Sequence, residues 1–217
     1  MASRIDRAKV TDTALRLLNE GGLDGLTLRR IAQELDVRAP ALYWHFANKQ
    51  ELLDDMATEM MRRMLEPLAA IPEDAGWEEH LTEAARVLRR ALLGYRDGGK
   101  AFSGTRFTEN WFAIPLERFL KVWTEQTGSG VRRGARAWYT AHVFTMGYVI
   151  EEQSVYPEPG KPRDPQYDLD DRARTMEGYP MASEAGWEFF EDLDRGYEEG
   201  LAALVAGLAA TAAVPGP

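Results

Sequence analysis

Apolar residues recur at every third or fourth position along most of this 217-residue chain. That spacing is typical of a helix with one buried face, whereas a half-buried strand alternates apolar and polar residues. We find no alternating run of β-branched residues bounded by hairpin turns, so the sequence predicts an all-α fold. The predicted helices cover residues 6–20, 28–35, 39–45, 48–65, 77–95, 97–104, 108–127, 130–156 and 183–210.

Capping signals set several of these boundaries. Ser3 followed three residues later by Asp6 can open the first helix, which the pair Gly21-Gly22 is expected to end. Asn48, followed three residues later by a glutamate, is typical of the start of a long helix. The five prolines between 157 and 180 make this segment the clearest predicted loop.

The composition excludes several kinds of chemistry. Because the chain has no Cys, it cannot form disulfides, thiolate zinc sites or iron–sulfur clusters, and it has no cysteine nucleophile. His142 and Glu151 are nine positions apart on one predicted helix, which places them about 180° apart around its axis. Nucleophile elbows, phosphate-binding glycine loops and dinucleotide motifs are absent. We therefore expect no enzymatic activity, no cofactor and no metal site.

Charge is divided unevenly along the chain. The net charge is −9, but residues 1–50 carry eight Lys or Arg against six Asp or Glu, a net of +2 that leaves −11 for residues 51–217. A polyanionic partner is therefore expected only at the first fifty residues. We expect a cytoplasmic protein without membrane contact, since the N-terminus lacks the apolar run of a secretion signal and the apolar tail is shorter than about 20 residues.

The predicted helices at 28–35 and 39–45, joined by a short turn, have the layout of a helix-turn-helix, whose last helix enters the DNA major groove. Tyr43, Trp44 and His45 form an aromatic cluster on a helix too short to bury all three. Expected phosphate contacts are Thr27, Arg29, Arg38 and Lys49. The alternative is that the aromatic residues are core and the arginines an ordinary solvated face.

Residues 26–57, LTLRRIAQELDVRAPALYWHFANKQELLDDMA, resemble the DNA-binding signature of the TetR family of repressors. The segments RRALLGYRDGGK (89–100), SGTR (103–106) and FTMGYVIEEQ (144–153) resemble its tetracycline repressor branch. The resemblance covers nearly the whole chain, but it is patchy over 107–140. It implies a homodimer in which an N-terminal helix-turn-helix head, residues 1–48, reads a palindromic operator. The larger helical body, residues 49–217, would bind an effector and pair with its partner.

In the head, the resemblance makes Arg29 a DNA contact from the second helix and places Lys49 on a phosphate. The recognition surface that it implies consists of Pro40, Ala41, Tyr43, Trp44 and His45. Ala39 stands where the tetracycline repressors have Gln. Because a side chain able to hydrogen-bond a base edge is missing there, we expect the operator to differ at that position.

In the body, the resemblance implies an effector pocket whose metal-binding part has changed. Phe102 replaces a His that helps hold a drug-bound magnesium ion, although Glu151 matches a second such position. A phenyl group cannot replace an imidazole ligand, so we expect no magnesium–tetracycline complex. A mostly apolar or aromatic effector with one anionic or hydrogen-bonding group is expected instead. The remaining pocket residues are Leu65, Ala84, Leu88, Trp111, Val143 and Met146, with Arg106 and His142 as polar groups; core packing is the alternative for the apolar ones.

The predicted helices 130–156 and 183–210 are the expected dimer interface. The second carries an apolar stripe that an intramolecular core would explain equally well: Trp187, Phe190, Leu193, Tyr197, Leu201 and Leu204. The short helix 97–104 is expected to couple the pocket to the head, so that a bound effector favours a dimer that releases DNA. The rival hypothesis is a helical scaffold or adaptor without specific DNA binding.

Overall fold

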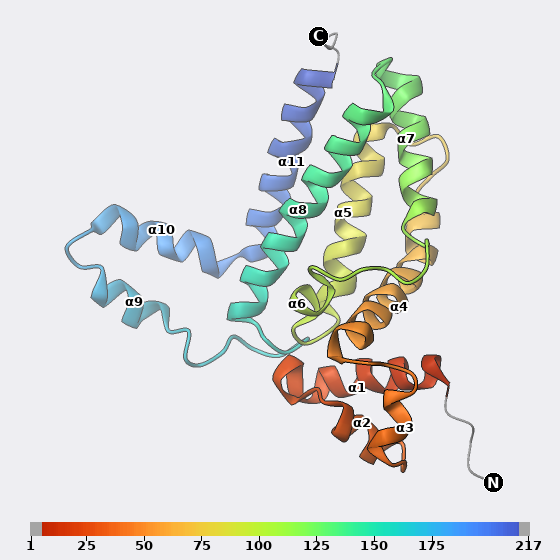
Figure 1. Cartoon of the computed structure of the whole chain (residues 1–217). Helices are drawn as coiled ribbons and strands as arrows, with labels where there is room; N and C mark the ends of the chain where they lie inside the picture. The colour runs from red at the N-terminus through yellow and green to blue at the C-terminus, as the bar shows by residue number, and fades with distance from the viewer. Residues whose placement is uncertain (1–5, 213–217) are drawn as a thin grey trace.

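The computed structural model describes residues 6–212, which form a small helical head below a larger helical body (Figure 1). The head consists of α1 (Arg7–Gly25), α2 (Leu28–Glu34) and α3 (Ala39–Tyr43). The body consists of α4 (Lys49–Ala69), α5 (Trp77–Leu93), α6 (Gly98–Phe102), α7 (Ala113–Thr127), α8 (Val131–Val155), α9 (Leu169–Thr175), α10 (Pro180–Glu191) and α11 (Leu193–Ala212). No strand occurs within residues 6–212, so the predicted all-α class is confirmed.

The start of α1 differs from the predicted pattern, in which Asp6 follows the cap. Asp6 is its N-cap, and the Asp6 carboxylate accepts a hydrogen bond from the Lys9 backbone N–H at 2.8 Å. Ser3, the first residue of the predicted pattern, lies outside the described residues. The apolar stripe of α1, which includes Val10 and Leu18, is fully buried in the head.

The predicted end of α1 at Gly21-Gly22 is wrong. Gly22 adopts a positive φ of 64° and interrupts the helical backbone, but the helix resumes and runs to Gly25. The interruption persists because the body satisfies the N–H that it frees: the Asp97 carboxylate accepts a hydrogen bond from Leu23 N–H at 3.0 Å. A glycine pair thus bends this helix instead of ending it.

Helix α4 joins the head to the body. Its predicted cap is confirmed, since the Asn48 side chain accepts a hydrogen bond from Glu51 N–H at 3.0 Å, and the Glu51 carboxylate accepts one from Ala47 N–H at 2.9 Å. The helix runs to Ala69, four residues beyond the predicted end, because its second half is buried in the body. One apolar core therefore runs from the head along α4 into the body.

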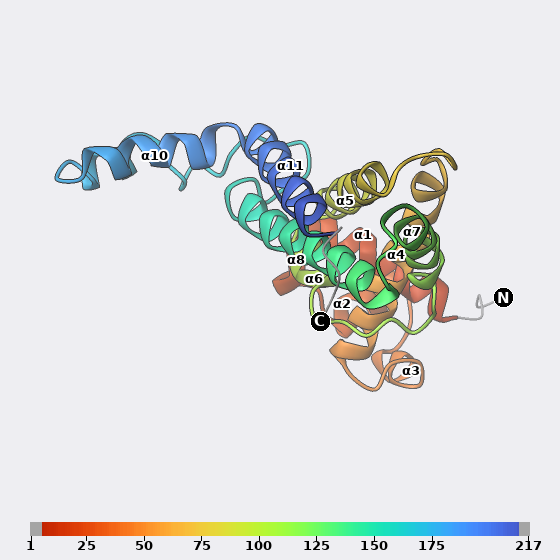
Figure 2. The ribbon, with the colours of Figure 1, turned by 90° about the horizontal axis from the view of Figure 1, so that it is seen from above.

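Helix α8 is the central element of the body and packs against α5, α6, α7 and α11 (Figures 1 and 2). A second apolar core fills the upper body, with Phe119 and Trp123 of α7 against Tyr197 and Leu201 of α11. The predicted start of α7 at 108 is wrong, because the helix begins at Ala113, two residues before Pro115. A proline is tolerated in a first helical turn, where its missing N–H has no helical partner.

The segment between α8 and α11 departs most from prediction. The proline-rich stretch contains helix α9, capped by Asp168, whose carboxylate accepts a hydrogen bond from Asp171 N–H at 3.0 Å. The single predicted last helix is two helices that break at Asp192, whose side chain accepts a hydrogen bond from Arg195 N–H at 2.9 Å and so caps α11. Helices α9 and α10 form an arm that projects sideways from the body (Figures 1 and 2).

The stripe expected at the dimer interface is divided between core and surface. Leu193, Tyr197 and Leu201 are buried within the chain, so the intramolecular alternative holds for these three. Trp187, on the arm, is exposed. Phe190 and Leu204 are half-buried. The break at Asp192 separates the stripe residues of α10 from those of α11, whereas one straight helix would have kept all of them on a common face.

A buried ion pair fastens α5 to α8. The Arg89 guanidinium lies 2.8 Å from the Glu152 carboxylate, and both side chains are nearly fully buried. Arg89 also pairs with the exposed Asp194 at 2.7 Å and lies over the Tyr197 ring. Desolvation raises the pKa of Glu152 despite the nearby positive charge. A buried charge left without its partner is strongly destabilising.

We therefore expect Glu152→Ala to lower the free energy of unfolding by about 3 kcal/mol. Glu151→Ala is the matched control, because the neighbouring Glu151 is exposed and forms no ion pair within the described chain; its effect should stay within about 0.5 kcal/mol. Urea denaturation followed by circular dichroism at fixed protein concentration measures both. Equal losses in the two variants would contradict the role of the buried pair.

Candidate nucleic-acid interface and ligand cavity

Helix α3 presents two aromatic side chains to solvent. Leu42 and Phe46, on either side of them in sequence, are fully buried and anchor this segment in the head. Tyr43 is 56% exposed and Trp44 is 90% exposed, at the end of the molecule farthest from the body (Figure 1). Large exposed aromatics held by a rigid anchor are typical of a binding surface, and the core alternative is therefore wrong for both.

Two exposed arginines of the head, on α2 and at the start of α3, have no carboxylate partner among the described residues. Arg29 on α2 and Arg38, the N-cap of α3, are exposed and form no ion pair with any described residue. The other described arginines of the head, Arg7, Arg16 and Arg30, each pair with a carboxylate. Free guanidinium groups on a head that also exposes aromatic rings are suited to the phosphates and bases of a nucleic acid.

The remaining predicted DNA contacts lie on the head or, for Lys49, at the first residue of α4 next to it. The Thr27 hydroxyl caps α2 by accepting a hydrogen bond from Arg30 N–H at 3.1 Å. Lys49 is exposed, and its ammonium donates a hydrogen bond to the Leu23 carbonyl at 2.8 Å, so it stabilises the end of α1. His45 is half-buried. Ala39, Pro40 and Ala41 form the first turn of α3.

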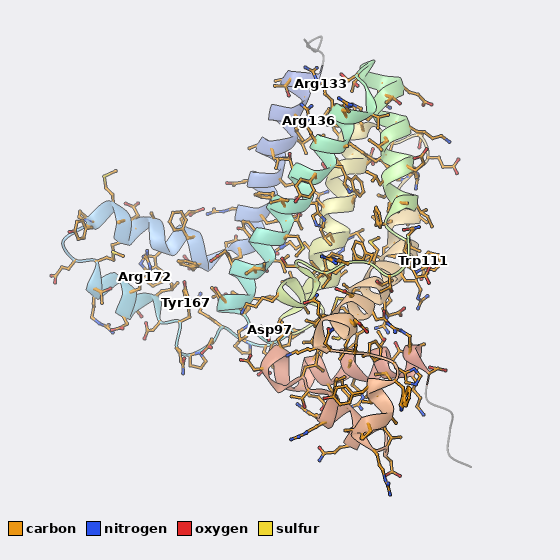
Figure 3. The ribbon with its side chains drawn as sticks, in the orientation of Figure 1. Asp97, Trp111, Arg133, Arg136, Tyr167 and Arg172 are labelled. Atoms are coloured by element: carbon orange, nitrogen blue, oxygen red, sulfur yellow. The ribbon has the colours of Figure 1, made fainter. Side chains whose placement is uncertain are left out.

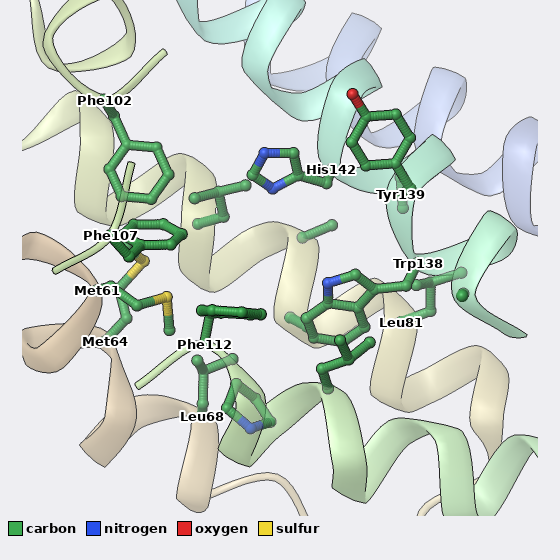
Figure 4. A pocket seen from close by; sticks show the side chains of 17 residues that line it. Met61, Met64, Leu68, Leu81, Phe102, Phe107, Phe112, Trp138, Tyr139 and His142 are labelled. Carbon is green, nitrogen blue, oxygen red and sulfur yellow. The ribbon is translucent and has the colours of Figure 1, made fainter. Parts of the chain in front are cut away.

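The body encloses an apolar cavity of about 350 Å³ between α4, α5, α6, α7 and α8 (Figure 4). Met61, Met64 and Leu68 line it from α4, at the spacing of a single helix face. Phe102 lies opposite, with its ring edge-to-face against Phe107 at a centroid distance of 5.5 Å. The volume falls within the range of small-molecule sites, which are about 300–1,000 Å³.

The structure brings together only some of the predicted pocket residues. Ala84, Leu88, Phe102 and His142 line the cavity. Leu65 lines a neighbouring cavity. Met146 is buried in the core without reaching the cavity, and Trp111 is half-buried on a groove between the head and the body.

Three predicted contacts point away from the cavity. Arg106 is exposed, and its backbone N–H donates a hydrogen bond to Asp54 at 2.9 Å. On α8, Val143 is 49% exposed, and Glu151 is exposed too. Trp138 and His142 occupy the face of α8 that meets the cavity, and positions one and nine residues beyond His142 fall on other faces.

Several cavity residues were not predicted. Met61, Met64 and Leu68 carry a detectable signal, since they belong to the apolar stripe of the long helix, which Leu68 continues beyond the predicted end at 65. Phe107 and Phe112 come from the irregular segment between α6 and α7, where no periodicity points to them. Only the packing of that segment against α4 reveals their role.

The cavity contains few polar groups. Burial lowers the pKa of His142, so its imidazole is neutral at neutral pH and offers one donor and one acceptor. None of the described lining residues carries a carboxylate. Phe102 offers no metal ligand and Glu151 points away, and the described residues contain no group of three or more His, Asp or Glu able to hold a metal ion. The cavity therefore does not fit a magnesium-bound drug.

Comparison with known proteins decides the family. Residues 10–56 match the model for bacterial regulatory proteins of the tetR family, and residues 70–212 match the model for the tetracyclin repressor-like C-terminal domain. The chain is 38% identical over 208 residues to the tetracycline repressor protein class D of Escherichia coli, covering 94% of both. The chain belongs to the TetR family. It is therefore a transcriptional regulator of a family of DNA-binding proteins that are not enzymes.

Two similar solved structures contain a bound partner, a small molecule in one and DNA in the other. A TetR variant from Acinetobacter baumannii AYE, in complex with minocycline, matches with a TM-score of 0.74 and 30% identity, covering 97% of this chain and 100% of that one. BioQ, solved with its double-stranded DNA operator, matches with a TM-score of 0.66 and 28% identity, covering 95% and 99%. Among residues 6–212 of this TetR-family chain, no helix is long and apolar enough to cross a membrane.

Measurements of stability test whether Leu42 anchors α3 in the core while Tyr43 lies on the surface. Leu42→Ala should lower the free energy of unfolding by about 2–5 kcal/mol, because it leaves a cavity in the head core. Tyr43→Ala, one position later, should change it by less than about 0.5 kcal/mol. Chemical denaturation of both variants makes the comparison. A large loss of unfolding free energy for Tyr43→Ala would show that the ring contributes to the core.

Proposed function

We propose that this chain is a ligand-responsive repressor that binds a palindromic DNA operator as a homodimer in the cytoplasm. A mostly apolar or aromatic small molecule with one anionic or hydrogen-bonding group fills the body cavity and releases the operator. Residues 1–48 form the DNA-binding head and residues 49–217 the ligand-binding and dimerisation body. The observation that carries the proposal is that α6 touches both parts: Phe102 lines the cavity, and Asp97, the N-cap of α6, is hydrogen-bonded to the head.

On the DNA, Tyr43 and Trp44 approach the bases from α3, with Pro40, Ala41 and His45 completing the surface. Arg29 and Arg38 contact phosphates, helped by Thr27 and Lys49. The support for this assignment is exposure and charge: both rings face solvent and both guanidinium groups lack carboxylate partners among the described residues. Phosphate contacts position such a head, whereas base contacts select the sequence.

The link between head and body is a set of hydrogen bonds at the bend in α1. Asp97 lies at the junction of the two parts (Figure 3) and holds Leu23 N–H at 3.0 Å. Beside it, the Asn19 side chain accepts a hydrogen bond from Arg96 N–H at 2.9 Å. A ligand that displaces Phe102 moves α6, and α6 then alters the position of the head. Such a ligand shifts the equilibrium only by its differential affinity for the two states.

The second subunit covers exposed apolar side chains on α8 and on the arm. On the arm, Met181 is 84% and Phe189 59% exposed, and Trp187 accompanies them; Val143 is exposed on α8. Exposed apolar groups of this size concentrated on one region are typical of an interface. Light scattering of the purified chain should give twice the 24.4 kDa monomer mass.

Selection of the purified protein against random duplex DNA, followed by titration at two salt concentrations, tests the proposed function. We expect a palindrome with half-sites about one helical turn apart and an affinity that falls with salt. Weak binding without sequence preference would instead favour the scaffold or adaptor hypothesis.

Within that titration, Arg38→Gln should weaken binding to all sequences and reduce the salt slope by about one. Arg16→Gln is the matched control: it removes the same charge, but the Arg16 guanidinium is already paired with Glu20 and Glu34. Its salt slope should stay unchanged. Equal effects of the two variants would indicate a general charge effect and no direct contact.

Substitutions at Asp97 can distinguish the effect of its backbone conformation from that of its hydrogen bond. The φ of Asp97 is 54°, a conformation that Gly and Asn adopt more readily than other residues. Asp97→Gly keeps the backbone conformation and removes the acceptor for Leu23 N–H, so operator affinity should fall about tenfold, equivalent to about 1.4 kcal/mol. Asp97→Asn keeps an acceptor and should stay within about threefold. A fluorescence anisotropy titration that finds the two variants equal would exclude this hydrogen bond as the link.

A further inference from the structure

A second cavity, of about 240 Å³, lies beside the main one and has a different chemical character. Its lining includes His80 from α5 and Arg118 from α7. Leu68, Ala84, Pro115 and Trp138 line both cavities, so the two share this boundary. Ala84 contributes only a methyl side chain to this boundary, and an elongated molecule that contacts both chambers would cross it there.

His80 is the unexplained group in this chamber. Its side chain is 3% exposed, and neither ring nitrogen has a hydrogen-bond partner among the described residues. The carbonyls of Ala75 and Gly76 lie close enough to favour its protonated form, but neither accepts a hydrogen bond of ordinary geometry. A buried polar group without a partner costs free energy, and a natural chain tolerates it chiefly where a ligand or water completes it.

Arg118 gives the chamber a positive charge. Its guanidinium donates hydrogen bonds to the carbonyls of Leu68 and Ile71 at the end of α4 and forms no ion pair within residues 6–212. A guanidinium has five N–H donors, so some remain for a ligand. Burial and the charge of Arg118 both lower the pKa of His80, which keeps its imidazole neutral and able to donate one hydrogen bond.

No described residue lining either cavity is acidic, although the chain as a whole carries a net charge of −9. The local field in the second chamber is therefore opposite to the average field of the protein. Ile114, which lines the chamber, is itself 57% exposed to solvent. A charged ligand group placed there need not lose all of its hydration.

We propose that the chamber around His80 and Arg118 binds the carboxylate of an elongated aromatic acid whose apolar part occupies the main cavity. His80 donates a hydrogen bond to the carboxylate, and Arg118 supplies the opposite charge. This inference rests on the proposed function, because it specifies the effector of the same body. It also moves the anionic recognition expected at Arg106 to the opposite end of the cavity system.

Two probes with the same rings and opposite charges test the proposal: 4-phenylbenzoate and 4-phenylbenzylamine. Isothermal titration calorimetry with the full chain should show the acid binding at least about tenfold more tightly, because a hydrogen bond to a charged group contributes about 1.5–3 kcal/mol. The net charge of −9 alone would favour the amine. A preference for the amine, equal affinities, or no binding of either probe at millimolar concentration would overturn the proposal.

Variants at His80 then locate the site. His80→Phe should weaken binding of the acid about tenfold and leave the amine unchanged, whereas His80→Gln, which keeps a donor, should stay within about threefold. His80→Phe should also unfold no more easily than the parent chain, because it removes a buried group without a partner. A loss of stability with unchanged acid binding would assign His80 a structural role only.

These outcomes separate this inference from the proposed function. Operator selection and salt dependence do not involve either probe, so they test the repressor independently. If the operator is found but the acid binds His80→Phe as tightly as the parent chain, only the assignment of this chamber fails. If the acid behaves as expected but no operator is found, the chamber stands and the repressor hypothesis fails.

Discussion

The structure depends on the burial of one face of α4 along its whole length. Leu52 and Met56 of this face are enclosed by the head, and Met64 and Leu68 by the body. A helix of 21 residues is about 30 Å long, so one rigid element extends from the DNA-facing end to the floor of the cavity. Since close-packed cores resist small distortions, a change at one end of α4 is carried to the other.

Positive charge without a carboxylate partner is found both in the head and in the body. In the head, most described arginines are neutralised by carboxylates, and the exceptions are Arg29 on α2 and Arg38 at the start of α3. In the body, the acidic residues lie outside both cavities, where Arg118 has no opposing charge within the described chain. An overall negative protein thus holds two local positive sites, because short-range fields depend on neighbouring groups more than on net charge.

Local sequence signals predicted the head well. The cap at Asn48 is confirmed, and the caps at Asp6 and Thr27 are of the same local kind, because each involves residues only three positions apart. The same kind of signal was missed at Asp168 and Asp192, where nearby prolines and a continuous apolar stripe suggested a loop and a single helix. A helix as short as α9 depends on its contacts with α10 and carries little periodicity of its own.

The sequence by itself determined the helical class, the absence of cysteine chemistry and the aromatic triplet of α3, since these follow from composition, periodicity and local spacing. Only the tertiary structure decided that His80 and Arg118 share a chamber and that Arg106 faces solvent. It also decided that α8 turns His142 toward the cavity and Val143 away from it. The reason is physical: which face of a helix is covered depends on segments far away in the sequence, whose packing no local pattern encodes.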